Sequence, residues 1–336
     1  MSKLKQIFIV GSSRSGTTMM GRILGNHSAI HTFKELHFFG TIWTNSVKIT
    51  LTKKEQINLL SHLFCIEKNG LFNQNKIAQF NAKSSKIINR KNLNHLEIYE
   101  LFLKEITTEN SATISCEQTP KNMYYLNEIL DFFPDAKVIN MVRDQRDVLL
   151  SQKNKWKRKF LGASKIPLSE VVRAYINYHP ILTAKVWSSS LFYTSKHSDN
   201  QKVKIIKFEE LLSKSESSIK GICDFLEIDF QEKMLKIPVV GSSTENDLEE
   251  NLEIDNSKIE KWKKGGLSNA EIYLSQKISN KMMNKFGYKM KKFSFPPIGI
   301  IFYIITFPIK LVLSFLLNIN RMGNIFEVVK KRFFVK

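Results

Sequence analysis

The sequence has few cysteines, and none of them lies in a paired motif. Its 336 residues include Cys65, Cys116 and Cys223, which are too widely spaced for a disulfide framework or a zinc motif. We therefore expect reduced thiols in a reducing compartment. No His, Cys and acidic residues have the spacing of metal ligands, so no metal is expected. An apolar leader is also missing, because residues 1–6 are polar and a candidate strand follows, which predicts a cytoplasmic protein.

Acidic residues are scarce as well. The chain has 31 of them against 51 basic residues, a net charge of +20. Residues 153–165 hold six lysines and arginines without an acid, and residues 281–336 hold eleven against Glu327 alone. Such segments attract a membrane surface, a polyanionic glycan or nucleic acid. For residues 153–165 a solvated lysine-rich surface is an equally good explanation. The 43% of hydrophobic residues excludes wholesale disorder.

Long apolar runs are absent until residues 296–319, which are almost wholly apolar. Lys310 lies near the middle of this run, and Pro308 is expected to break it. We interpret the run as a membrane-embedded or interfacial hairpin or helix pair with basic flanks; the alternative is a core helix of the globular domain. The sequence thus predicts a domain over 1–292 and an apolar, basic, membrane-associating tail over 293–336.

The stretch GSSRSGTT follows the apolar run of residues 7–10, which is typical of a buried strand, and an amphipathic helix follows it. Gly11 and Gly16 have the spacing of a phosphate-binding loop, but Thr17 stands where such loops carry lysine. Arg14 restores a positive charge from inside the loop. This combination favours a ligand with one phosphate and a second charged group over a nucleoside triphosphate. The residues expected to bind it are Ser13, Arg14, Ser15, Gly16, Thr17 and Thr18.

Further strands are predicted over 136–142 and 203–208, with helices over about 168–188 and 215–226. Alternating strands and helices indicate an α/β fold with a doubly wound parallel sheet of the P-loop type. Ligands of such sheets bind at the carboxyl ends of the strands. Because one charged turn holds Arg14 and the other holds Arg143, we expect both arginines on the same rim.

These motifs, in this order, resemble those of sulfotransferases that use 3′-phosphoadenosine-5′-phosphosulfate (PAPS), most closely the branch with protein-tyrosine sulfotransferases and many bacterial relatives. Residues 7–18 resemble the family's 5′-phosphosulfate loop, and residues 138–151 its 3′-phosphate motif. Residues 207–211 and 256–288 resemble two later family segments. The resemblance implies PAPS as co-substrate, a hydroxyl acceptor and no metal.

The resemblance also implies roles for particular residues. Arg143 and Ser151 would bind the 3′-phosphate, and Arg14 would stabilise the leaving phosphate. Lys261 lies in a segment that would close over the nucleotide; the alternative for this segment is a solvated run of charges. Glu35 matches the position of a catalytic glutamate and is the predicted general base. His37 is the second candidate, because other sulfotransferase branches use a histidine.

Two departures from the family pattern stand out. Gln118 occupies a position that often carries lysine, and Lys121 compensates for it only if its side chain turns inward. Gln145 replaces a frequent proline. The acceptor is expected to be a glycan, a lipid-linked compound or another amphipathic molecule, and no nucleic acid is expected. The alternatives are a P-loop kinase or nucleotidase, or a non-catalytic basic protein that binds membranes.

Overall fold

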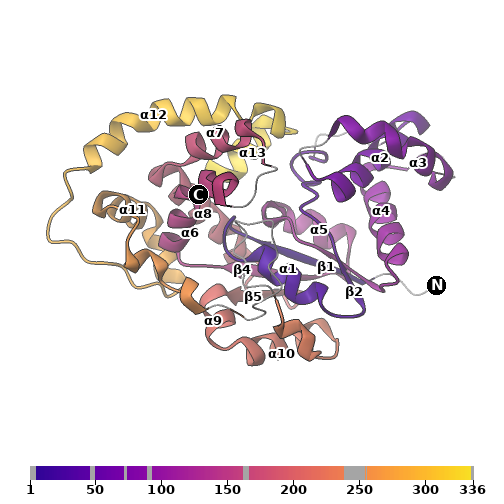
Figure 1. The fold of residues 1–336 in the computed structure, drawn as a ribbon, viewed down its shortest axis with the longest axis horizontal. Helices are drawn as coiled ribbons and strands as arrows, with labels where there is room; N and C mark the ends of the chain where they lie inside the picture. Colours follow the sequence, from indigo (N-terminus) through magenta and orange to yellow (C-terminus); the bar gives the residue numbers. More distant parts are fainter. Residues whose placement is uncertain are drawn as a thin grey trace.

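The computed structural model describes residues 5–45, 50–71, 74–88, 93–161, 166–237, 254 and 256–333. Five parallel strands form one sheet in the order β2-β3-β1-β4-β5, with helices on both faces (Figure 1). The strands are β1 (Lys5–Gly11), β2 (Ile30–Thr32), β3 (Ile114–Glu117), β4 (Lys137–Val142) and β5 (Val203–Lys207). The predicted α/β class and parallel sheet are confirmed.

Strand β1 lies at the centre of the sheet and alternates between its two faces, as strand geometry requires. Phe8 and Val10 belong to one apolar cluster, while Ile7 and Ile9 belong to the other. The first cluster includes side chains from α2 (Lys53–Asn69), α4 (His95–Glu109) and α5 (Leu126–Phe132). The second includes side chains from α1 (Thr17–Gly25), α9 (Phe208–Ser213) and α10 (Ser215–Leu226). Burial on both faces explains the continuous apolar run in the sequence.

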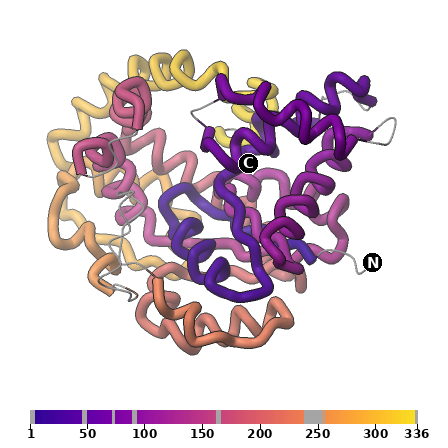
Figure 2. The backbone as a smooth tube through the Cα atoms, turned by 45° about the vertical axis from the view of Figure 1, so that its right-hand side comes forward, coloured from indigo at the N-terminus to yellow at the C-terminus, as the bar shows by residue number. Residues whose placement is uncertain are grey.

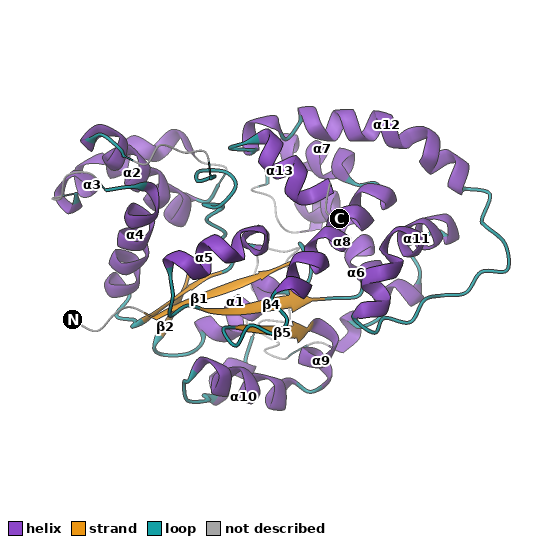
Figure 3. Cartoon of the chain, turned by 180° about the vertical axis from the view of Figure 1, so that it is seen from behind, coloured by secondary structure: helices purple, strands orange, loops and turns teal. Residues whose placement is uncertain are grey.

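The other helices cover the ends and flanks of the sheet (Figures 2 and 3). The α-helices are α3 (Asn81–Ile87), α6 (Gln145–Lys153), α7 (Leu168–Asn177), α8 (Pro180–Lys196), α11 (Asn269–Lys285), α12 (Ile300–Leu316) and α13 (Ile325–Phe333). The short 3-10 helices are η1 (Gln74–Phe80), η2 (Pro120–Tyr125), η3 (Lys155–Leu161), η4 (Glu232–Leu235), η5 (Asn256–Lys258), η6 (Lys261–Lys264) and η7 (Ile319–Arg321).

The helix predicted over 168–188 is wrong as a single element, because the chain forms α7 and α8 there. His179 is extended, with φ −156° and ψ 136°, and Pro180 begins the second helix. A residue before proline is biased away from the helical region, whereas proline is well placed in a first turn. The two helices therefore meet at the proline.

In the C-terminal segment, α12 continues through Pro308, so the expected break at that residue is wrong. A proline removes one backbone hydrogen bond of a helix, and the packing of α12 along α7 and α8 keeps the remaining turns in line. Within the described residues, none of the helices combines the length and the apolar character needed to cross a bilayer. After η7 the chain turns back, and α13 packs on α8 (Figure 1).

Candidate functional site

The loop between β1 and α1 has the backbone shape of an anion cradle. Arg14 and Gly16 have φ of 74° and 95°, in the left-handed region that L-residues with side chains rarely adopt. A side chain at Gly16 would collide with the ring of Phe208, so only glycine fits there. The hydroxyl of Ser15 is buried and has no hydrogen-bond partner among the described residues. The N-terminus of α1 therefore presents backbone N–H groups and an unsatisfied hydroxyl where a phosphate can bind.

Of the other predicted loop residues, Thr17 is buried at the start of α1, and Ser13 and Thr18 are partly exposed beside it.

The second predicted anion-binding residue, Arg143, follows β4 on the same edge of the sheet. Its guanidinium donates to the carbonyl oxygens of Arg14 at 3.3 Å and Lys258 at 2.9 Å. It also lies over the ring of Phe208, 4.2 Å from the centroid. Its Nε is buried without a partner among the described residues. Both predicted turns thus lie on one rim, as their positions after parallel strands require.

The two turns are also joined by a side-chain hydrogen bond. Arg14 Nε donates to Ser151 Oγ at 2.8 Å, across 137 residues of sequence. Burial and the nearby charges of Arg158 and Arg143 lower the pKa of Arg14 to about 10, so it is still protonated at neutral pH. A cation held this way offers its remaining N–H groups to an anion in the loop.

Glu35 lies in the loop after β2, and its carboxylate is 3.2 Å from Nε2 of His37. Its side chain is 42% exposed, so a substrate can reach it. Burial alone would raise the pKa of Glu35, but the His37 hydrogen bond and the charges of His37, Lys155 and Lys121 outweigh this and lower it. The carboxylate is ionised at neutral pH and free to accept a proton.

A buried carboxylate that the sequence reasoning missed, Glu117, holds the loop of Glu35 in place. It ends β3 and accepts hydrogen bonds from the N–H groups of Leu36, at 3.4 Å, and Thr119, at 3.1 Å, and from the side chains of Thr119 and Asn122. Thr119 Oγ1 in turn accepts from the N–H of His37 at 3.2 Å. Burial raises the pKa of Glu117 to about 7. The feature of the sequence that could have indicated this supporting role is a single acidic residue in an otherwise uncharged strand.

Glu209, also missed, fixes the turn that carries Arg143. Its two carboxylate oxygens accept from the N–H of Asp144 at 2.8 Å and from the hydroxyl of Tyr288 at 3.1 Å. Glu209 follows Phe208, whose ring contacts Gly16 and Arg143. The end of β5 therefore supports both turns that were predicted to bind anions.

Lys261 begins η6 and is exposed. The neighbouring Trp262 donates its backbone N–H to Asp147 at 2.9 Å, and its ring lies 4.0 Å from the guanidinium of Arg146. These contacts place η6 against α6, next to the turn of Arg143. Lys261 thus lies close to the turn that was predicted to bind the 3′-phosphate.

The position of Gln118 differs from that of Lys121. A Cβ added at Gly21 of α1 would lie 2.5 Å from Oε1 of Gln118, so this side chain packs against α1. Lys121 is exposed at the start of η2 and is electrostatically coupled to Glu35. Lys121, and not position 118, therefore supplies positive charge near Glu35.

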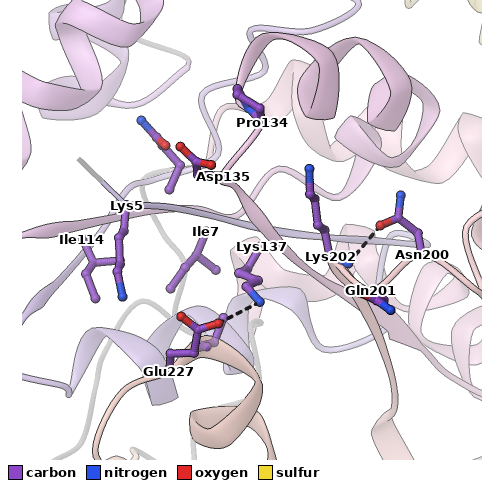
Figure 4. A pocket seen from close by; sticks show the side chains of 12 residues that line it. Lys5, Ile7, Ile114, Pro134, Asp135, Lys137, Asn200, Gln201, Lys202 and Glu227 are labelled. Atoms are coloured by element: carbon purple, nitrogen blue, oxygen red, sulfur yellow. Dashed lines mark hydrogen bonds and ion pairs between the residues drawn. The ribbon is translucent and has the colours of Figure 1, made fainter. Parts of the chain in front are cut away.

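A hollow at the opposite edge of the sheet is lined by the amino ends of β1 and β4 and by the turn before β5 (Figure 4). An ion pair between Lys137 and Glu227, with 3.2 Å between nitrogen and oxygen, crosses it. Because parallel α/β sheets bind ligands at the carboxyl ends of their strands, we place the candidate site at the rim of Arg14 and Arg143.

Known proteins resemble this chain in sequence and in fold. A sulfotransferase family model matches residues 6–232, which is more than half of the chain. An uncharacterized protein from Aquifex aeolicus (strain VF5) is 28% identical over 148 residues, which cover 44% of this chain and 16% of that relative. The chain thus spans only a small part of the length of this curated relative.

Two solved structures share the fold. They are the sulfotransferase domains of the curacin biosynthetic pathway and of the Synechococcus PCC 7002 olefin synthase, each with a TM-score of 0.53 and 19% identity. The matches cover 86% and 85% of this chain and 100% and 96% of those domains. With a family model over two thirds of its length and the sheet and loop in place, this chain is a member of the sulfotransferase family.

Proposed function

We propose that this sulfotransferase moves a sulfuryl group from PAPS to a hydroxyl of its acceptor, with Glu35 as the general base and Arg14 at the leaving phosphate. The observation that carries the proposal is the adjacency of two anion-binding turns. Arg143 donates to the carbonyl of Arg14, and Arg14 donates to Ser151. A nucleotide with phosphates at both its 5′ and 3′ positions fits such a pair of sites.

On the 5′ side, the loop from Ser13 to Thr18 would hold the phosphosulfate through its backbone N–H groups and hydroxyls. On the 3′ side, Arg143 and Ser151 would hold the ribose phosphate, with Lys261 nearby. Buried atoms without partners support this assignment, namely Ser15 Oγ on the first side and Arg143 Nε on the second. An anion would satisfy both and remove the cost of leaving them unpaired.

In the transfer step, the acceptor oxygen forms a bond to sulfur while the bond from sulfur to the bridging phosphate oxygen breaks. The hydroxyl proton passes to the carboxylate of Glu35. Negative charge develops on the phosphate oxygen that leaves, and Arg14 is the fixed cation of the loop that stabilises it. The hydrogen bond from His37 orients Glu35, which makes His37 a positioning residue in this scheme.

Nucleotide binding is tested with adenosine 3′,5′-bisphosphate (PAP), the product that retains both phosphates. At 100 times Kd, PAP should stabilise the fold by about 2.7 kcal/mol, which is measured as a rise in the unfolding temperature. The Arg143→Ala variant should show a much smaller rise at the same PAP concentration. Stabilisation by ATP with Mg²⁺ but not by PAP would contradict the proposal and favour a kinase or nucleotidase.

Transfer itself is tested with ³⁵S-labelled PAPS and extracts that contain small molecules, glycans and lipids. Wild-type protein should label a product, and Arg14→Ala should reduce the label strongly. The proposal fails if the wild type and Arg14→Ala give equal label.

We also propose that α12 and its neighbours bind the surface of a membrane. Apolar side chains are exposed along α12, α7 and η3, and they include Phe302, Ile305, Leu168 and Phe160. Lys289, Lys291 and Lys292 are exposed in the segment that precedes α12 in the chain. Exposed apolar surface with basic flanks is typical of a helix that lies in the interface of anionic lipids.

Flotation with vesicles tests this second proposal. We expect binding to vesicles that contain phosphatidylglycerol, weaker binding to phosphatidylcholine alone, and loss of binding for Phe302→Asp with Ile305→Asp. Lys220→Gln, on the opposite side of the sheet in α10, is the control and should bind like the wild type. Equal binding by the α12 variant would overturn this role of the tail.

A further inference from the structure

Two cations that are electrostatically coupled to Glu35, and a third that is coupled to one of them, have no partner of their own among the described residues. They are Lys121 of η2, Lys155 of η3 and Arg332 of α13. None of them donates a side-chain hydrogen bond or lies within ion-pair distance of a carboxylate in that part of the chain. They come from three segments far apart in sequence, so the fold itself gathers them.

The lysine next to Arg332 is paired, in contrast to Arg332 itself. Lys331, next to Arg332, donates to the carbonyl of Tyr124 at 2.8 Å and to Glu128 at 3.0 Å, and lies over the ring of Tyr125. These contacts hold α13 against η2, and Figure 3 shows α13 beside α8, toward the arrowheads of the strands. Structural lysines here have partners, whereas Arg332, one residue further, has none in the described structure.

Bringing these cations together costs the folded protein free energy. The charge of Arg332, with those of Lys155 and Arg173, lowers the pKa of Lys121 well below its usual value. Burial and Arg14 lower the pKa of Lys155 to about 8. Like charges gathered without counter-charges are typical of functional sites, where a ligand supplies the missing charge.

The cations around Glu35 outnumber the negative charges that the phosphosulfate end of the nucleotide brings. The phosphosulfate end of PAPS brings one charge on its phosphate and one on its sulfuryl group. Arg14 in the loop and Lys155, which is coupled to Arg14, match these two charges. Lys121 and Arg332 then remain, and Glu35 is the one carboxylate among the groups that raise the pKa of Lys121. Unmatched positive charge thus persists beside the base after the nucleotide binds.

We infer that Lys121 and Arg332 bind an anionic group of the acceptor, next to the hydroxyl that Glu35 deprotonates. This inference rests on the proposed function and names the class of its acceptor: a hydroxyl compound that also carries a phosphate or a carboxylate. The anion would be held from two elements, η2 and α13, so the C-terminal helix forms part of the acceptor site.

The charge of the acceptor is tested directly. The product labelled by wild-type protein in an extract of the source organism is purified, its sulfate ester is removed by mild acid, and the acceptor is followed by mass spectrometry. We expect the desulfated acceptor to be retained on an anion exchanger at pH 7. A desulfated acceptor that passes through uncharged overturns the inference but leaves sulfuryl transfer in place.

Variants test the two residues. Lys121→Gln and Arg332→Gln should each raise the KM for the purified acceptor about 10- to 100-fold, the usual effect of losing a hydrogen bond to a charged group. The KM for PAPS and the Kd for PAP should stay within about twofold, because neither residue contacts the nucleotide in this scheme. Lys330→Gln, an exposed lysine on the same helix, is the matched control and should leave both KM values unchanged.

Unfolding temperatures show whether each variant is still folded, so that a change in KM is not mistaken for a loss of the fold. Because Lys121→Gln removes a repelled cation, it should unfold at the wild-type temperature or higher. If Lys121→Gln raises the KM for PAPS and not that for the acceptor, Lys121 serves the sulfuryl group and the inference is wrong. If the wild type binds PAP but labels no product, the proposed function fails, and the inference fails with it.

Discussion

Two carboxylates in this protein are each surrounded by cations, but the contacts differ. Glu170 accepts hydrogen bonds from both Arg173 of α7 and Arg321 of η7, and its side chain is 9% exposed. Glu35 is 42% exposed and has His37 at 3.2 Å, while Lys121 and Lys155 act on it through their charges alone. At Glu170 the carboxylate is bonded to both cations, and this matched cluster ties the C-terminal segment to α7. At Glu35 the positive charge exceeds that of the single carboxylate, which leaves positive charge for a ligand.

The largest effect is expected from removing the base. Glu35→Gln keeps the shape of the side chain but cannot accept a proton, so kcat should fall about 100- to 10,000-fold. The Kd for PAP, measured by calorimetry, should not change. His37→Gln is the matched comparison, because a positioning residue should cost less than the base. If His37→Gln abolishes transfer while Glu35→Gln spares it, the roles of the two residues are reversed.

Breaking the matched cluster should instead change stability. Glu170→Gln leaves Arg173 and Arg321 without their shared carboxylate, which should lower the free energy of unfolding by about 1–3 kcal/mol. The measurement is denaturant unfolding. The control is Glu216→Gln, which breaks the exposed pair with Lys220 in α10 and should cost less than about 0.5 kcal/mol. Equal losses for the two variants would show that the cluster at Glu170 contributes no more than a surface pair.

A third prediction uses the pKa of Lys155, about 8 in the folded protein against an ordinary value of 10.5. Above pH 8 this lysine loses the charge that helps to hold the phosphosulfate, so kcat/KM for PAPS should fall by about tenfold per pH unit. Over the same range the unfolded chain still holds the proton, so this group adds stability as the pH rises. The groups that face Lys155 are Arg14, Arg158, Arg173 and Glu35.

Lys155→Arg separates this effect from other titrations. An arginine keeps its charge, so the fall in kcat/KM should move to higher pH, while Lys157→Arg, on the same short helix, should leave the profile unchanged. An unshifted profile for Lys155→Arg would assign the titration to another group.

The sequence predicted the elements that carry strong local patterns. The apolar runs at 7–10 and 136–142 became β1 and β4, and the helix over 215–226 has the predicted bounds. The expectation that Arg14 and Arg143 share one rim followed from parallel strands and agrees with their hydrogen bond. These features are readable because each depends on periodicity within one segment or on the topology of the sheet.

What could not be predicted depends on contacts between distant segments. Strands β2 and β3 have three and four residues, too few for a period to show. Glu117 looks like an ordinary acid until the fold places Leu36 and Asn122 around it. Arg332 lies in the segment 293–336, for which the sequence predicts membrane association, and no pattern there indicates that Lys331 holds α13 against η2. No pattern in the sequence around Lys121 predicts that Arg332, more than 200 positions away, lies close to it.

The smallest effect is expected at the hydrogen bond that joins the two anion sites. Ser151→Ala removes the acceptor of Arg14 Nε and one predicted ligand of the 3′-phosphate, so the Kd for PAP should rise about 2- to 10-fold, as for the loss of one neutral partner. Ser213→Ala, at the exposed end of α9, is the control. Because Arg14 itself remains, the labelled product should still form. If Ser151→Ala lost PAP binding as completely as Arg143→Ala, Ser151 would be needed to hold the loop of Arg14 in shape. The 5′ and 3′ phosphate sites would then form a single unit instead of two adjacent sites.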